Sequence, residues 1–290
     1  MSIAVTGGDG EFGRAVLEAL GKRTREPRVA TVRELGTAQR IPGVDYRPGD
    51  FDRPDSLRGS LSGVDAVLIN ATFFGADPSL RRRRVSSAIR AAAGAGVGRI
   101  VLTSWPDLDN ARLPAVQDYK DLEALVTTAG PAWTILRLGY GLPVALARDV
   151  VWARAGGELV APAAGARVTP ADVTDLAEAA AVVLAQPGRH DSVVHELSGP
   201  DSITWDELAE LADLPFRAVT DDAYRDYLSR FNLPAEVAQQ LIDMYADFRS
   251  DWASTPTLTL GELTGHAPVP GIEAVSRQVS RFPAGLGQGR

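Results

Sequence analysis

The sequence of 290 residues predicts an α/β fold: a doubly wound parallel sheet followed by a smaller, mainly helical C-terminal part. The first observation is a glycine-rich turn between a short apolar run, residues 2–6, and an amphipathic segment, residues 12–20. The second is the alternation of apolar runs with helical patterns up to residue 137, because successive parallel strands need a crossover helix. The third is the loss of this alternation from about residue 140.

Apolar runs and helical periodicity divide the chain into predicted elements. Strands are predicted at residues 2–6, 28–32, 44–52 (running into a loop), 64–70, 99–104, 132–137 and 193–197. Helices are predicted at residues 12–20, 54–61, 81–96, 116–128, 172–184, 205–211, 221–230 and 234–248. Thr204 and Glu207 have the spacing of a capping box. Four arginines, residues 81–84, would begin one helix against its dipole, so we expect them on a solvated face, with contact to an anion or a partner as the alternative.

The composition excludes several classes of protein. Without cysteine there are no disulfides, thiolate metal sites or cysteine nucleophiles. The three histidines have no metal-ligand spacing, so we expect no metal. A net charge of −7 argues against nucleic-acid binding driven by bulk charge. No apolar stretch is long enough to span a bilayer and the first strand begins at once, so we expect no membrane segment, no signal peptide and a cytoplasmic protein.

The turn Thr6-Gly7-Gly8-Asp9-Gly10-Glu11-Phe12-Gly13 indicates a dinucleotide-binding unit, because a strand precedes it and a helix follows. Gly7 would permit the tight turn, Gly10 the approach of a pyrophosphate, and Gly13 the close packing of helix on strand. The free N–H groups of the helix N-terminus would face the phosphates. We therefore predict a nucleotide-binding Rossmann domain at residues 1–150. Residues 151–290 would form a substrate-binding lid, with some return of the chain to the sheet around residues 168–198.

Several residues after the other strands are predicted to complete this site. Arg33 follows the second strand, where an arginine pairs with the 2′-phosphate of NADP, whereas a carboxylate such as Glu34 would bond the ribose of NAD. We favour NADP(H) over NAD(H), because the arginine comes first. The predicted cofactor-binding residues are Thr6, Gly7, Gly8, Gly10, Glu11, Phe12, Gly13, Arg33, Asp50, Phe51, Asn70, Ala71, Thr72 and Ser104.

Four segments resemble the NmrA-like branch of the atypical short-chain dehydrogenases/reductases. They are the turn at residues 6–13, Trp133-Thr134-Ile135-Leu136-Arg137, Glu196-Leu197-Ser198-Gly199-Pro200, and Leu260-Gly261-Glu262-Leu263-Thr264-Gly265-His266. This branch includes NAD(P)H quinone oxidoreductases, triphenylmethane dye reductases and nucleotide sensors without catalysis. The resemblance implies NADP(H) binding, and does not by itself imply turnover.

The sequence departs from this family at the residues that would carry catalysis. No tyrosine has a lysine four residues on, so the pair that lowers the tyrosine pKa in short-chain dehydrogenases is missing. Tyr119 stands where that lysine is usual, and Lys120 is one residue, about 100° of helix, away. After Arg137 the aromatic position is Tyr140, but Pro143 and Val144 replace a polar pair. The candidate catalytic residues are Tyr119, Lys120 and Tyr140, beside Ser104.

Three functions fit these residues. The first is an NADPH-dependent reductase of a small, aromatic or quinonoid molecule, whose stable reduced oxyanion needs little acid catalysis. The second is a non-catalytic NADP(H) sensor that binds a protein partner. The third is a biosynthetic enzyme using Asp107, Asp109 or Asp172 as acids for dehydration, isomerisation or cyclisation. We expect a small-molecule substrate and a monomer or homodimer.

Overall fold

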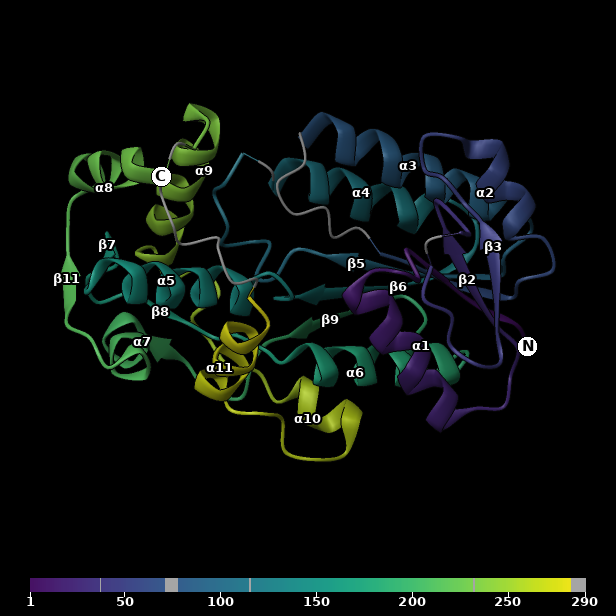
Figure 1. Cartoon of the computed structure of the whole chain (residues 1–290). Helices are drawn as coiled ribbons and strands as arrows, with labels where there is room; N and C mark the ends of the chain where they lie inside the picture. Colours follow the sequence, from purple (N-terminus) through teal and green to yellow (C-terminus); the bar gives the residue numbers. More distant parts are fainter. Residues whose placement is uncertain (37, 71–77, 115, 232, 283–290) are drawn as a thin grey trace.

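The computed structural model describes residues 1–36, 38–70, 78–114, 116–231 and 233–282 (Figure 1). Seven parallel strands form the main sheet in the order β3-β2-β1-β4-β5-β6-β9. They are β1 (Ile3–Thr6), β2 (Arg28–Val32), β3 (Val44–Pro48), β4 (Ala66–Ile69), β5 (Arg99–Ser104), β6 (Ala132–Leu138) and β9 (Val193–Leu197). This is the Rossmann strand order with one strand added after β6, and it confirms the predicted fold class.

Helices cover both faces of this sheet, as Figure 1 shows. On one face lie α2 (Pro54–Ser60), α3 (Pro78–Gly94) and α4 (Val116–Thr128). On the other lie α1 (Glu11–Arg23), α6 (Val173–Ala185) and the short α10 (Thr259–Thr264). Because both faces are covered, the central strands β1, β4 and β5 are buried at every position. The carboxyl ends of the strands therefore meet at one edge, where the loops build the site.

The C-terminal part packs against this edge. Its helices are α5 (Leu142–Gly156), α7 (Trp205–Ala212), α8 (Asp221–Leu228), a 3₁₀ turn (Ser229–Phe231), α9 (Ala235–Phe248) and α11 (Gly271–Arg281). Two small sheets complete it: β7 (Leu159–Ala161) pairs in parallel with β11 (Phe216–Ala218), and β8 (Arg167–Val168) pairs antiparallel with β10 (Ile203–Thr204). Trp205, Tyr224, Tyr245, Phe248 and Trp252 are buried among these elements and form an aromatic core.

Local signals explain most helix ends. Thr204 and Glu207 form the predicted capping box at the start of α7, and Asp172 accepts the Thr174 N–H at the start of α6. Gly157 ends α5 at φ +80°, a left-handed conformation that glycine adopts without strain. The sequence prediction missed α5, α10, α11 and the four strands of the small sheets. The chain does not lose its order at residue 140.

The prediction for the four arginines is wrong for two of them. Because α3 begins at Pro78, the arginines lie beyond its first turn. The side chain of Arg81 is 6% exposed and its guanidinium lies 5.0 Å from the centre of the Tyr119 ring. Arg84 is 17% exposed and donates to Asp52. Only Arg82 and Arg83 lie on the solvated face, with 54% and 72% of their side chains exposed.

A buried ion pair holds the C-terminal part together. Asp149 of α5 accepts hydrogen bonds from the Trp205 indole at 3.0 Å and from the Tyr245 hydroxyl. Its other oxygen lies 2.7 Å from Arg148, and the carboxylate thereby raises the pKa of that guanidinium. A single carboxylate therefore joins α5, α7 and α9.

We predict that Asp149→Ala lowers the free energy of unfolding by about 3–5 kcal/mol, because it removes the carboxylate that pairs with a largely buried guanidinium and accepts from two buried donors. Urea unfolding at pH 7 measures this change. The matched substitution Glu210→Ala, at an exposed position of α7, should change the free energy by less than about 0.5 kcal/mol. Equal small effects of the two substitutions would contradict this role of Asp149.

Candidate functional site

The glycine-rich turn joins β1 to α1 at the carboxyl edge of the sheet. Gly7 has φ +61°, which requires the left-handed region, and its carbonyl accepts the Gly10 N–H at 3.0 Å. A Cβ on Gly13 would overlap the Gly7 carbonyl, and a Cβ on Gly8 would lie 2.6 Å from that of Ala30 in β2. The turn is thus closed against both its own strand and the neighbouring strand, which explains three of the four glycines.

Gly10 is the N-cap of α1 and provides no side-chain hydrogen bond to the helix. The amides of the first turn of α1 are therefore available to an external acceptor, such as a phosphate. A Cβ on Gly10 would lie 3.3 Å from the Gly7 carbonyl, so a larger residue would narrow this end of the turn. These features fit a dinucleotide pyrophosphate.

A cavity of about 430 Å³ opens beside this turn. Six residues that line it were predicted from the sequence: Gly7, Gly10, Arg33, Asp50, Phe51 and Asn70. Four further residues line it, of which only Glu34 was considered from the sequence: Asp9, Thr31, Glu34 and Gly49. The cavity lies next to β1 and β4, where the strand order reverses and open α/β sheets bind nucleotides.

The other predicted cofactor residues lie around this cavity or outside the described chain. The Thr6 hydroxyl accepts the Asn70 N–H at 2.9 Å and so joins the ends of β1 and β4. Phe12 is buried under the turn, with its ring centre 5.5 Å from that of Tyr140. Ala71 and Thr72 lie outside the described residues.

A second group of residues follows β5. Ser104 is buried, and its hydroxyl has no hydrogen-bond partner among the described residues. The next residue, Trp105, stacks on Trp252 with ring centres 5.5 Å apart and an angle of 7° between the rings. Its other neighbour is Tyr119, at 5.3 Å between ring centres. A stack of aromatic rings is therefore attached to the residue that directly follows this buried hydroxyl group in the chain.

The three candidate catalytic residues occupy different surroundings. Tyr119 is buried between Trp105 and Arg81, and this burial raises the pKa of its phenol. Lys120 is exposed, and the carboxylates near it in sequence, Asp121 and Glu123, bind Arg82 and Arg137 instead. Tyr140 donates its hydroxyl hydrogen to Glu11 at 2.8 Å. Tyr140 lies on the α1 side of the sheet and is distant from Tyr119 in the sequence. The structure thus does not bring the three hydroxyl and amino groups into one hydrogen-bonded set.

One arginine, Arg137, binds several carboxylates at this edge of the sheet. The sequence analysis did not predict this cluster. Arg137 of β6 donates to both oxygens of Glu123, at 3.0 and 2.9 Å, and to Asp109 at 2.8 Å. Glu196 lies opposite Arg137 in the β6–β9 register, 3.9 Å from its guanidinium. The Glu196 carboxylate also accepts the Asp107 N–H at 2.6 Å. The cluster ties the loop after β5 to the sheet.

Glu196 is the carboxyl group of this cluster that is most affected by its surroundings. Burial raises its pKa from 4.5 to about 7, and the nearby charges of Asp107 and Glu123 add to this rise. The Asp107 N–H and the Arg137 guanidinium act in the opposite direction. One proton therefore binds to this cluster near neutral pH.

The fold and the site define a dinucleotide-binding α/β protein of the Rossmann type. Residues 7–187 match the NAD(P)H-binding family, and the chain belongs to this family. It is 28% identical to quinone oxidoreductase 2 of Escherichia coli K12 over 290 residues, covering 94% of this chain and 97% of that protein. It is 27% identical to NAD(P)H azoreductase of Xenophilus azovorans over 295 residues, covering 97% and 99%.

A solved structure shows the same architecture. Triphenylmethane reductase of Citrobacter sp., complexed with NADP(H), matches with a TM-score of 0.85 and 25% identity, covering 95% of this chain and 99% of that one. Together these relatives confirm the resemblance to the NmrA-like branch of the short-chain dehydrogenases/reductases. No helix among the described residues could cross a membrane. In the same part of the chain no cluster of three His, Asp or Glu could hold a metal ion.

We predict that Gly13→Ala weakens dinucleotide binding at least tenfold and destabilises the fold by about 1–3 kcal/mol, because its methyl group would displace the Gly7 carbonyl. Calorimetric titration and urea unfolding measure the two effects. Gly59→Ala in α2, where a Cβ meets open space, is the matched control: it should leave the affinity unchanged and raise the stability by up to about 1 kcal/mol. Normal affinity of the Gly13 variant would show that the turn has room to relax.

The raised pKa of Glu196 predicts a pH-dependent stability. Between pH 4.5 and about 7 the folded chain binds more protons than the unfolded chain, so this group makes stability fall as the pH rises. Over that pH range this group should lower the free energy of unfolding of the wild type by about 1–2 kcal/mol, after allowance for its partial exposure. Glu196→Gln should abolish this decrease. Urea unfolding at pH 4.5, 6 and 8 tests this, with the exposed Glu210→Gln as control. The prediction fails if the two variants show the same pH profile.

Proposed function

We propose that this chain is an NADPH-dependent reductase that transfers hydride to a small quinonoid or aromatic acceptor in the cytoplasm. The observation that carries the proposal is the cavity beside the glycine-rich turn, with Arg33 in its wall. The relatives named above, a quinone oxidoreductase, an azoreductase and a dye reductase, support the choice of acceptor. Acceptors of these kinds share a conjugated, planar group.

The preference for NADPH rests on the end of β2. Arg33 and Glu34 both line the cavity, directly after the strand. The exposed Arg33 guanidinium would form an ion pair with the 2′-phosphate of NADPH. The ribose hydroxyl of NADH carries no charge and would form no such ion pair. Asp50 and Phe51 on the neighbouring loop would border the adenosine.

The acceptor would lie beside Ser104 and Trp105. NADPH, once bound, supplies a hydride to an electrophilic acceptor. The Ser104 hydroxyl, which has no partner among the described residues, would donate a hydrogen bond to an acceptor oxygen, and the partly exposed Trp105 would pack against a planar ring. Catalysis then rests mainly on holding the two reactants in register.

Quinonoid acceptors also fit the missing Tyr-x-x-x-Lys pair. Reduction of a quinone by hydride leaves a stabilised oxyanion, which takes its proton from water or a nearby acid. Because burial raises the pKa of Tyr119, its phenol stays protonated and can donate a hydrogen bond. We propose Tyr119 as a wall of this site and Lys120 as an exposed cation at its edge. Tyr140 would act at the phosphate end, through Glu11.

We predict that the purified protein oxidises NADPH in the presence of 1,4-naphthoquinone, with hydroquinone formed in equal amount. Arg33→Gln should raise the KM for NADPH about tenfold, equivalent to 1.4 kcal/mol, and leave the KM for NADH unchanged. Absorbance at 340 nm follows the oxidation, and product analysis confirms the stoichiometry.

The exposed Arg25→Gln, which lies outside the cavity, is the matched control for charge. Tight NADPH binding without consumption of any quinone, azo dye or triphenylmethane dye would contradict the reductase and favour a nucleotide sensor. Equal KM changes for NADPH and NADH would contradict the role of Arg33.

A further inference from the structure

A negative charge stands in the first turn of α1, whose backbone amides would receive the pyrophosphate. It belongs to Glu11, whose side chain lines a second cavity, of about 400 Å³, on the α6 side of α1. Glu11 is the first residue of α1 and follows the N-cap Gly10 directly. This carboxylate suits the positive end of the helix dipole. It is unfavourable to a bound pyrophosphate, because like charges repel over such short separations. Tight binding of a dinucleotide therefore needs something that offsets Glu11.

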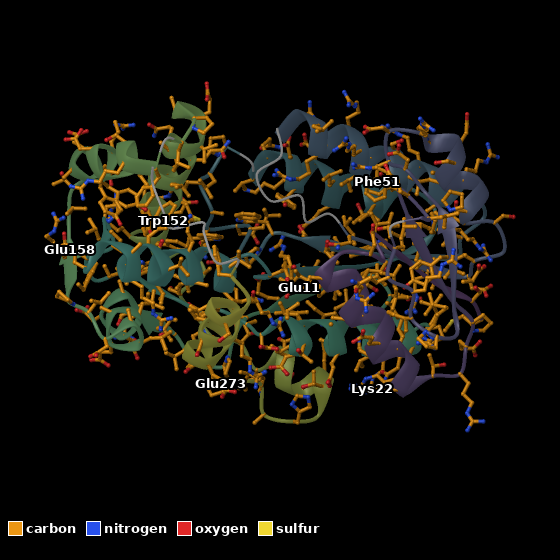
Figure 2. All side chains as sticks on the ribbon, viewed as in Figure 1. Glu11, Lys22, Phe51, Trp152, Glu158 and Glu273 are labelled. Carbon is orange, nitrogen blue, oxygen red and sulfur yellow. The ribbon has the colours of Figure 1, made fainter. Side chains whose placement is uncertain are left out.

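Three side chains from distant segments hold the Glu11 carboxylate. Arg281 donates to Oε1 at 2.8 Å, Gln278 donates to the same oxygen at 3.5 Å, and Tyr140 donates to Oε2 at 2.8 Å. Arg281 and Gln278 belong to α11, the last described helix. Figure 2 shows Glu11 at the start of α1, toward the side on which α11 lies. The C-terminal helix thus contacts the turn that would bind phosphate.

Arg281 is the cation that neutralises this carboxylate. The nearest arginine on α1 itself, Arg14, donates to the Gln39 carbonyl and to Glu18. Burial and the adjacent Glu11 charge raise the pKa of the Tyr140 phenol, so it stays a neutral donor. Tyr140 therefore orients the carboxylate and Arg281 supplies the opposite charge. The side chains of Glu11 and Arg281 are 40% and 52% exposed and both line a second cavity on the α6 side of α1, so solvent and salt screen their charges in part.

We propose that Arg281 is a positioning residue of the dinucleotide site: through Glu11 it cancels the repulsion between the first turn of α1 and the pyrophosphate. Gln278 and Tyr140 hold the carboxylate in the orientation that Arg281 can neutralise. The inference rests on the proposed function, because it requires a pyrophosphate on the glycine-rich turn. It gives α11 a part in cofactor affinity, although α11 contributes no residue to the cavity wall.

The test compares ligands with and without the pyrophosphate. Arg281→Gln should weaken NADPH binding about five- to tenfold at low salt, as expected for one uncompensated charge near the surface. The affinity for adenosine 2′-monophosphate, which fills the Arg33 end alone, should not change. Glu11→Gln added to Arg281→Gln should restore the wild-type affinity for NADPH, and Arg281→Lys should keep most of it. The loss should shrink as salt is raised. Calorimetric titration measures each affinity.

Arg277→Gln is the matched control, because this arginine lies one turn earlier on α11 and binds Asp172 and Glu273 instead. If Arg281→Gln unfolds the protein, the single variant Glu11→Gln tests the inference instead. It should bind NADPH at least as tightly as the wild type. Unchanged NADPH affinity of Arg281→Gln, equal losses for both ligands, or no restoration by Glu11→Gln would overturn the inference. Wild-type protein that binds no dinucleotide would instead overturn the proposed function.

Discussion

The close contact of α1 with the carboxyl end of β1 is the constraint on which the rest of the molecule depends. Only hydrogen fits between Gly13 and the Gly7 carbonyl, so the helix begins directly at the end of the central strand. This places the first-turn amides of α1 at the edge where the strand order reverses. The cavity and the cofactor residues on neighbouring strands follow from this position.

A second set of contacts links the sheet to the C-terminal part. Arg137 and Glu196 lie opposite each other in the β6–β9 register, and the Asp107 N–H links Glu196 to the loop after β5. The Asp107 side chain in turn accepts the Ala253 N–H, and the Trp252 indole donates to the Pro106 carbonyl. The aromatic surface at Trp105 is therefore fixed by the sheet on one side and by the helical part on the other. A planar acceptor would meet a rigid wall at this place.

The sheet and the phosphate turn could be predicted from sequence because their signals are local. Each central strand is a short apolar run, and the turn needs glycine at fixed spacing. Other elements lack such a signal. The helix α5 is buried on most sides and shows no apolar face. The helix α11 differs, because its buried residues Gly271, Ala274, Val275 and Gln278 follow helical spacing, so its signal was present in the sequence and was missed. The two small sheets have strands of two or three residues, which form only when distant segments meet.

The site residues also divide into those that local sequence patterns reveal and those that depend on contacts between distant segments. Arg33, Asp50 and Phe51 follow strands whose ends must meet at one edge, so their place in the cavity could be predicted from sequence. The Arg137 cluster and the Arg281–Glu11 pair depend on contacts between segments far apart in the chain, which no local pattern reveals. The burial of Arg81 against Tyr119 is a similar case, since sequence alone suggested a solvated arginine.

These contacts also explain how the site can work without the usual tyrosine–lysine pair. Tyr119 stands at the lysine position, but Arg81 covers its ring and burial raises the pKa of its phenol, so it is not an activated base. What remains is the aromatic stack at Trp105 and the Ser104 hydroxyl, which has no hydrogen-bond partner among the described residues. Such a site can orient a ring and polarise an oxygen, yet it offers little acid–base power. It suits acceptors whose reduced form is already a stable anion, and it disfavours simple ketones, whose alkoxide needs a strong proton donor.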